Sequence, residues 1–242
     1  MSIPSVPNYG IRPDYVANKE NRARREEGAV FWSPRRIRYA LWYQWHVYAW
    51  ARDLVRNRKI RTAVDVGCGP AVKFEALLVP EVDRAIGIDQ PHIIDYCRKT
   101  YAPDRYVSDD FEAPRLDLGE KADLIICCDV IEHVMDPDIL LSYIKRLATP
   151  DTLILISTPD RDAVRGPGSL TPSNADHVRE WTAAEFRTYL EGAGFAVDEL
   201  RHLPPLKPGP NLLTAVHLLH ALRPGRSWRF NMAALCRVKP SA

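Results

Sequence analysis

The sequence has little that would mark a membrane or secreted protein. No run of about 18 apolar residues occurs, so we expect no transmembrane helix. The first seven residues have neither a basic stretch nor an apolar core, so we expect no secretory signal there. These absences predict a cytoplasmic protein.

Cysteine is scarce as well. The five cysteines are an odd number and no two have the spacing C-x-x-C, which argues against a disulfide framework and against a compact zinc site. Three of them fall in apolar, strand-like runs, so we expect reduced cysteines that act as small packing residues. The five are Cys68, Cys97, Cys127, Cys128 and Cys236.

The chain as a whole has no large excess of positive or negative charge, but its two parts do. The net charge of +2 is the sum of +8 in residues 1–61 (13 Lys/Arg, 5 Asp/Glu) and −6 in residues 62–242 (20 Lys/Arg, 26 Asp/Glu). A basic N-terminal segment favours an anionic partner such as a phosphate, a nucleic acid or a lipid surface. A solvated helix face with internal ion pairs explains it equally well, and both interpretations stay open.

The N-terminal quarter carries most of the tryptophan. Residues 1–14 contain several prolines and predict an irregular arm. Ser33-Pro34 is typical of a helix start, and a helix is expected from about Pro34 to Asn57, with aromatic residues at helical spacing. We interpret residues 1–60 as an arm and an aromatic cap that packs on the rest of the chain.

From residue 61 onward, short apolar runs alternate with helical patterns. Such repeated units predict an α/β fold in which a doubly wound, mostly parallel sheet of about seven strands is covered on both faces. The expected strands are Thr62–Val66, Arg84–Asp89, Arg105–Ser108, Ala122–Cys128, Thr152–Ser157, Phe195–Leu200 and Trp228–Val238. The expected helices are Val72–Val79, Asp138–Ala148, one opened by a capping box at Thr182 and ended by Gly192 and Gly194, and Asn211–Leu222 within an insertion at about 204–225.

The sharpest motif is VDVGCGP at residues 64–70. A strand leads into a G-x-G turn and then into a helix, and Gly67 and Gly69 let the backbone approach a ligand closely because neither has a Cβ. A dinucleotide-binding turn needs a third glycine, G-x-G-x-x-G, and that position is Val72. The turn therefore predicts a ligand at the carboxyl edge of the sheet but not NAD or FAD.

A second motif, GID at residues 87–89, ends the next strand with an acid. Asp89 follows Gly69 by 20 positions, a distance at which a carboxylate can accept hydrogen bonds from both hydroxyls of a ribose.

Together these motifs resemble the class I S-adenosylmethionine (SAM)-dependent methyltransferases, over about residues 61–200. SDDF at 108–111 falls where the family has an acid and an apolar neighbour at the adenine. Two further stretches, DLIICCDVIEHVMDP at 123–137 and HVREW at 177–181, resemble the ubiquinone-, sugar- and small-molecule-type branch of that family. The resemblance implies a Rossmann-like domain over residues 61–242, with an antiparallel last strand and SAM as cofactor.

The resemblance also assigns site residues. Gly67 and Gly69, with Cys68 between them, and Asp89, with its neighbour Gln90, are expected to bind the cofactor. Asp110 and Phe111 are expected at the adenine, Asp129 at the methionyl end, and Asp65 beneath the glycine turn. Each of these has a structural alternative, such as a tight turn at the glycines or a capped turn at Asp109 and Asp110.

Two histidines are candidates for catalysis. Removal of a proton from an acceptor hydroxyl suits an imidazole, and His133 follows the fourth strand at the expected position of the methyl group. His177 is the second candidate. A divalent metal on Glu132, His133 and His177 is an alternative, ranked lower because no compact ligand motif supports it, so we expect no metal.

The sequence thus predicts a SAM-dependent methyltransferase that methylates an oxygen of a small-molecule or saccharide acceptor. An acceptor with an anionic group would be compatible with the basic N-terminal segment. Two alternatives remain: an RNA-directed methyltransferase, disfavoured because no RNA-binding module is recognisable, and a non-catalytic partner subunit of the same fold. The sequence leaves the oligomeric state open, including a homo-oligomer.

Overall fold

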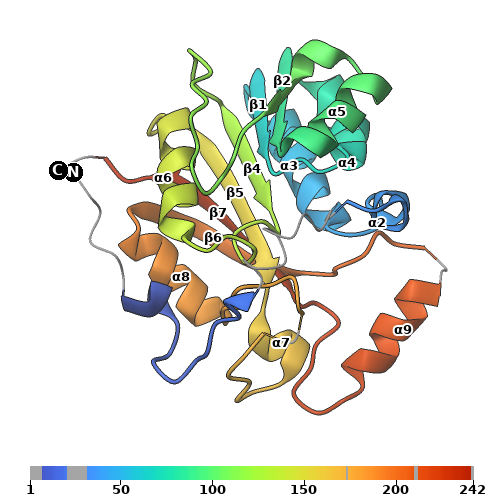
Figure 1. The fold of residues 1–242 in the computed structure, drawn as a ribbon, viewed down its shortest axis with the longest axis vertical. Coiled ribbons are helices and arrows are strands. Elements are labelled where there is room, and N and C mark those ends of the chain that lie inside the picture. Colours follow the sequence, from blue (N-terminus) through green and yellow to red (C-terminus); the bar gives the residue numbers. More distant parts are fainter. Residues whose placement is uncertain (1–6, 21–31, 173, 210–211, 241–242) are drawn as a thin grey trace.

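The computed structural model describes residues 7–20, 32–172, 174–209 and 212–240. Within them lies one seven-stranded sheet in the order β3-β2-β1-β4-β5-β7-β6 (Figure 1). Neighbouring pairs from β3 to β5 are parallel, whereas β7 runs antiparallel to both β5 and β6. The expected sheet with an antiparallel last strand is therefore confirmed. The strands are β1 (Thr62–Val66), β2 (Arg84–Asp89), β3 (Tyr106–Ser108), β4 (Leu124–Cys128), β5 (Leu153–Pro159), β6 (Phe195–Leu203) and β7 (Asn231–Val238).

Helices cover both faces of this sheet. The α-helices are α2 (Pro34–Tyr39), α3 (Trp45–Asn57), α4 (Val72–Leu77), α5 (Pro91–Thr100), α6 (Pro137–Leu147), α7 (Arg161–Arg165), α8 (Ala183–Gly192) and α9 (Leu212–Ala221). Three short 3₁₀ turns, η1 (Pro7–Gly10), η2 (Val79–Glu81) and η3 (Pro103–Arg105), complete the described elements.

The alternation of side chains along the central strands builds two cores. Val64 and Ile125 face a core that also contains apolar side chains of α6 and α8. Ala63 and Leu124, one position away, face the core formed with α3, α4 and α5. Because both faces of the central strands are buried, their sequences read as continuous apolar runs. Because β1, β2 and β4 run parallel, their carboxyl ends share one edge of the sheet, and the site lies at that edge.

The expected single helix from Pro34 to Asn57 is wrong: the structure has α2 and α3 with a break between them. Gln44, just before α3, has a left-handed φ of 54°. Its N–H donates to the carbonyl of Pro205, 3.0 Å away, and Tyr43 forms an isolated bridge with Leu206. The break comes from these contacts with a segment about 160 residues later, and no proline or glycine marks it.

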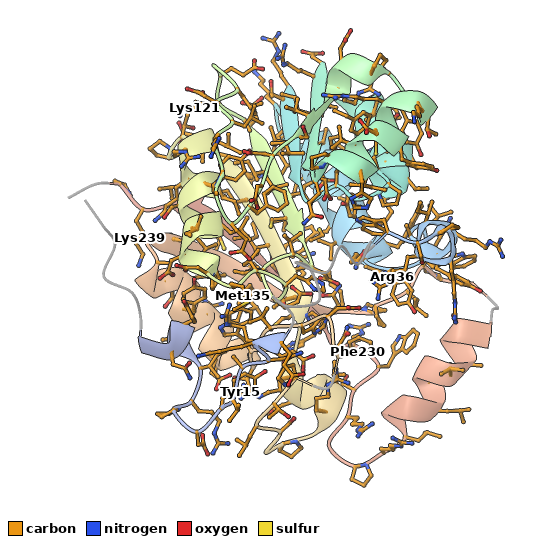
Figure 2. All side chains as sticks on the ribbon, in the orientation of Figure 1. Tyr15, Arg36, Lys121, Met135, Phe230 and Lys239 are labelled. Atoms are coloured by element: carbon orange, nitrogen blue, oxygen red, sulfur yellow. The ribbon has the colours of Figure 1, made fainter. Side chains whose placement is uncertain are left out.

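The N-terminal arm packs against the other half of the molecule. Ile11 and Tyr15 are buried in the core shared with α6 and α8. Trp181 donates from Nε1 to the carbonyl of Tyr9 (2.9 Å), and the N–H of Glu180 donates to the Tyr15 hydroxyl (2.9 Å). Tyr15 is labelled in Figure 2. The arm thus fixes the loop that leads into α8.

Several local expectations are confirmed. Thr182 and Glu185 form the reciprocal capping box of α8, and all five cysteines are free and buried.

The C-terminal strand begins at Asn231 rather than at Trp228. Asn211, where the last helix was expected to begin, lies outside the described residues. No helix among those described is long and apolar enough to cross a membrane. The proposed domain boundary at residue 60 falls between α3 and β1 and stays a prediction.

Candidate active site

The turn between β1 and α4 forms the floor of the site. Gly67 and Gly69 have positive φ values of 87° and 55°. A Cβ on Gly67 would lie 2.3 Å from a methyl of Val130, and one on Gly69 would lie 2.5 Å from the ring of Trp32. Neither position therefore admits a side chain. Ala71 in the same turn also has a left-handed φ of 55°, although it is not a glycine.

Asp89, at the carboxyl end of β2, is tied to this turn. One carboxylate oxygen accepts from the N–H of Gly69 and the other from the N–H of Gln90, both at 2.7 Å. Burial raises the pKa of Asp89, and the two hydrogen bonds oppose that rise. Each oxygen has a second lone pair, so this anchored carboxylate can accept two further hydrogen bonds.

Asp65 lies beneath the turn. It is fully buried, one carboxylate oxygen accepts from the Tyr48 hydroxyl at 2.8 Å, and the other has no hydrogen-bond partner. Burial raises the pKa of Asp65 to about 7. The neighbouring Lys73 donates from Nζ to the carbonyl of Ala40 and lies 5.1 Å from the centre of the Tyr48 ring. Tyr48 and Lys73 thus connect α3 and α4 through a buried polar layer.

Asp129, at the end of β4, links the sheet to the cap. It has a positive φ of 51°. Its carboxylate accepts from the Ser157 hydroxyl (2.6 Å) on β5 and from the side-chain amide of Gln44 (3.0 Å). Burial raises the pKa of Asp129, and both hydrogen bonds lower it.

The loop after β3 contributes Asp110 and Phe111. Phe111 is buried and packs beside Tyr143, with 6.2 Å between ring centres. Asp109 has a structural role instead, because its carboxylate accepts from the N–H groups of Arg115 and Leu116 and so closes the loop.

Glu132, His133 and His177 meet at the opposite wall. One potential ligand atom from each lies within 4.8 Å of the other two, and the imidazole rings are perpendicular with centres 4.9 Å apart. Glu132 is completely buried, and neither carboxylate oxygen has a hydrogen-bond partner among the residues described. Burial, together with the nearby charge of Asp129, raises the pKa of Glu132 well above its usual value.

Both imidazoles are held through Nδ1. In His133 this nitrogen lies 2.6 Å from the carbonyl oxygen of Asp176, and in His177 it lies 2.7 Å from a carboxylate oxygen of Glu180. A carbonyl or carboxylate oxygen only accepts, so Nδ1 carries the proton in each ring. In the neutral rings Nε2 then carries the lone pair. His177 Nε2 lies 2.9 Å from the amide nitrogen of Asn174, consistent with that tautomer.

These groups surround one cavity of about 1010 Å³. Nine of the eleven residues expected from the sequence line it: Gly67, Cys68, Asp89, Gln90, Asp110, Phe111, Asp129, His133 and His177. The other two, Asp65 and Gly69, are hydrogen-bonded to the lining residues Tyr48 and Asp89. The cap supplies a wall through α2, and the connection between β6 and β7 supplies Pro205 and Phe230. Figure 2 labels two of these lining residues, Arg36 of α2 and Phe230.

Sequence reasoning missed part of the lining. Gln44, Tyr48 and Lys73 face the cavity or hold its floor, and Trp32 covers Gly69. Tyr48 does not belong to the helical pattern of aromatic residues at positions 39, 42, 43 and 50, so that pattern gave no signal for it. Nothing in the local sequence marks Gln44, whose position depends on the break between α2 and α3.

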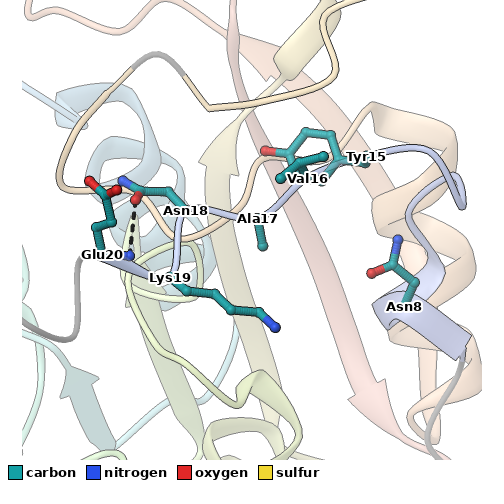
Figure 3. Close-up of a pocket in the computed structure, with 7 residues that line it drawn as sticks. All are labelled: Asn8, Tyr15, Val16, Ala17, Asn18, Lys19 and Glu20. Carbon is teal, nitrogen blue, oxygen red and sulfur yellow. Dashed lines mark hydrogen bonds between the residues drawn. The ribbon is translucent and has the colours of Figure 1, made fainter.

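A second hollow, of about 580 Å³, lies beneath the N-terminal arm (Figure 3). Seven residues of the arm line it, among them Tyr15 and Asn18, and none is a candidate site residue. The chemistry-bearing residues therefore gather around the first cavity.

Known proteins match the same region. The family model described as a methyltransferase domain matches residues 33–200. Over 165 residues the chain is 32% identical to a probable S-adenosylmethionine-dependent methyltransferase of Mycolicibacterium smegmatis, covering 65% of this chain and 60% of that protein. It is 33% identical over 106 residues to a ubiquinone biosynthesis O-methyltransferase of Methylococcus capsulatus, covering 42% and 44%.

A third relative is named as an enzyme that methylates RNA. The chain is 27% identical over 168 residues to a small RNA 2'-O-methyltransferase of Mus musculus, covering 59% of this chain and 40% of that protein. The chain thus spans less than two thirds of the length of each of these three relatives.

Proposed function

The chain belongs to the family of SAM-dependent methyltransferase domains, and on that premise we propose that it methylates an oxygen of a small-molecule or saccharide acceptor. The observation that carries the proposal is a shared cavity. The glycine turn, Asp89 and Asp129 line one part of it, and His133 and His177 line another.

The residues at the floor fit the cofactor. Gly67 and Gly69 leave room that a Cβ would fill, Asp89 presents an anchored carboxylate for ribose hydroxyls, and Asp65 has an unpartnered buried oxygen. Cys68, Gln90, Asp110, Phe111 and Asp129 would complete the binding set. SAM supplies an electrophilic methyl group on a sulfonium, so the protein has to align the acceptor and remove its proton.

His133 is the first candidate for the base. Its Nδ1 is held by the Asp176 carbonyl, which fixes the ring and leaves Nε2 as the basic nitrogen. His177 is oriented more strongly, through the Glu180 carboxylate, and is the second candidate. Both side chains line the cavity, but His177 can accept a proton from a bound hydroxyl only after its Nε2 gives up the hydrogen bond from the Asn174 amide.

A divalent cation is a second way to activate the same hydroxyl. The observation in its favour is the cluster itself: ligand atoms of Glu132, His133 and His177 lie within 4.8 Å of one another. Imidazoles that ligate metals commonly donate their other N–H to a carboxylate or carbonyl, as both rings do in this site. Coordination would also satisfy the two buried oxygens of Glu132.

Methyl transfer by wild type and His133→Ala, each with EDTA or with added Mg²⁺ or Mn²⁺, separates the two mechanisms. For a general base, we expect His133→Ala to lower turnover by roughly 10²–10⁴-fold while EDTA leaves the wild type unchanged. For a metal, EDTA abolishes wild-type turnover, Mg²⁺ or Mn²⁺ restores it, and Glu132→Gln is impaired as well. His202→Ala, an imidazole outside the cavity, is the matched control. A fully active His133→Ala variant would contradict both assignments.

The RNA-directed alternative keeps one observation in its favour, the similarity to the murine small RNA 2'-O-methyltransferase. Arg35 and Arg36 of α2 line the cavity, where a phosphate would compete with Asp176 for Arg36. Methyl transfer from labelled SAM to a panel of phenolic compounds, saccharides and short RNAs tests the acceptor class. We expect label in a small acceptor; label only in RNA would replace our proposal with this alternative.

A further inference from the structure

The insertion between β6 and β7 carries an apolar helix that the proposed function does not use. Six large hydrophobic side chains are exposed in the part of the chain that the structure describes, and four of them fall between residues 216 and 222. These are Val216 (53% exposed), Leu218 (49%), Leu219 (65%) and Leu222 (79%). Leu218 and Leu219 lie in the last turn of α9, and Leu222 follows directly after it, with its N–H donating to the carbonyl of Leu219 (3.3 Å), so the three lie together at the end of the helix. Figure 1 shows α9 at the periphery, away from both helical layers of the sheet.

The charged residues in the last part of the sequence, which contains this apolar face, have one sign. No Asp or Glu occurs anywhere after Glu199, whereas seven Lys or Arg do. Arg223 and Arg226 follow directly after the last exposed leucine. An apolar face flanked by cationic side chains is complementary to a surface that is apolar inside and anionic outside.

The insertion is anchored at the rim of the cavity on both sides of α9. Before the helix, the N–H of Lys207 donates to the carbonyl of Trp42 (2.7 Å), close to Pro205 in the lining. After it, the N–H of Asp160 donates to the carbonyl of Phe230 (2.7 Å), another lining residue. The insertion that carries α9 therefore begins and ends next to residues of the cavity lining.

We propose that α9 docks the protein onto the surface of an anionic phospholipid membrane, with Leu218, Leu219 and Leu222 inserted among the lipids and Arg223 and Arg226 at the phosphates. The ten-residue helix is about 15 Å long, half the thickness of the hydrocarbon core, so it lies in the interface and does not span it. Bare RNA would be expected to meet basic and aromatic groups rather than a row of leucines. Docking does not require methyl transfer, so its test is independent of the proposed function.

Co-sedimentation of the full chain with vesicles tests the proposal. We expect binding to vesicles that contain phosphatidylglycerol and much weaker binding to pure phosphatidylcholine, because the arginines need anionic headgroups. The triple variant Leu218→Ser/Leu219→Ser/Leu222→Ser should lower the partition coefficient about tenfold or more. Arg223→Gln/Arg226→Gln should weaken binding to the anionic vesicles alone and reduce its dependence on salt.

The matched control is Val16→Ser/Leu170→Ser, which removes the two exposed large apolar side chains that lie outside residues 216–222 in the described part of the chain and should leave vesicle binding unchanged. Circular dichroism verifies that each variant is folded. Equal sedimentation of wild type and the leucine variant would overturn the proposal, as would failure of the wild type to bind either vesicle. A concentration-dependent dimer that the leucine variant loses, without lipid binding, would assign the face to a second copy. Binding of single-stranded RNA through α9 without lipid binding would overturn it too.

Discussion

At the scale of single residues, carboxylates at strand ends shape the site. Asp65, Asp89 and Asp129 come from the three adjacent strands β1, β2 and β4, and burial raises the pKa of each. Asp89 and Asp129 could be predicted from the sequence, because each ends or follows an apolar run of a parallel sheet, and Asp65 because it lies two residues before the first glycine of the glycine motif. Their partners could not, since Tyr48 and Gln44 come from the cap and meet them only in the folded chain.

Asp89→Ala tests the ribose assignment. The substitution removes a carboxylate that can accept two hydrogen bonds from a ligand, each worth about 1.5–3 kcal/mol to a charged acceptor. We expect the affinity for S-adenosylhomocysteine to fall at least about tenfold in isothermal titration calorimetry. Asp95→Ala, on the exposed side of α5, is the control and should bind as the wild type does. Unchanged affinity in Asp89→Ala would place the adenosyl group elsewhere.

Asp65 makes stability depend on pH in a specified direction. Its pKa of about 7 in the folded chain lies above the ordinary value of 3.8, so the folded state binds the proton more tightly. The contribution of Asp65 to the free energy of unfolding is thus fully present below about pH 4 and is lost as the pH rises through about 7.

Asp65→Asn should remove this part of the pH dependence, because the amide does not titrate and its oxygen still accepts from the Tyr48 hydroxyl. Urea unfolding at pH 5 and pH 8 measures it as a difference between variants, since Asp89, Asp129 and Glu132 titrate in the same direction. We expect a smaller loss between the two pH values for Asp65→Asn than for wild type or for the surface variant Asp83→Asn. If wild type, Asp65→Asn and Asp83→Asn lost the same free energy of unfolding between pH 5 and pH 8, the pKa of Asp65 would not be raised in the folded state.

At the scale of elements, the cap determines how the cavity is closed. The short apolar strands could be predicted nearly to the residue, because parallel strands buried on both faces leave an uninterrupted pattern. The cap could not: α2 and α3 are separated where Tyr43 and Gln44 meet Pro205 and Leu206. Such a contact between distant segments overrides helix propensity and leaves no local signal.

The hydrogen bond from Gln44 to Asp129 should couple the cap to the sheet. Gln44→Leu keeps the size of the side chain but removes the donor, and we expect a loss of about 1.5–3 kcal/mol in the free energy of unfolding. Gln44→Glu should cost more, because it sets a second carboxylate against that of Asp129. Thermal unfolding and limited proteolysis of the cap measure both effects. A Gln44→Leu variant as stable and as protease-resistant as wild type would mean that the cap is held by its apolar contacts alone.

At the scale of the whole molecule, the N-terminal arm and the cap helix α3 pack against opposite faces of the sheet. The arm packs against the core of α6 and α8, whereas α3 packs against the core of α4 and α5. The sequence predicted an arm and an aromatic cap but not that they lie on opposite faces. Tyr15, for example, has a polar surrounding sequence and is buried only through contacts with the loop before α8. Pairing between segments so far apart in the chain is set by the complete fold.

The central claim is that the cavity binds SAM, and thermal unfolding with S-adenosylhomocysteine tests it most directly. A ligand that binds only the folded state at about 100 times its dissociation constant stabilises that state by about 2.7 kcal/mol. For a chain of this length, that corresponds to a rise in melting temperature of roughly 5–10 °C. NAD at the same concentration should give no rise, because the turn has Val72 where a dinucleotide site needs glycine. Stabilisation by NAD and not by S-adenosylhomocysteine would contradict the account.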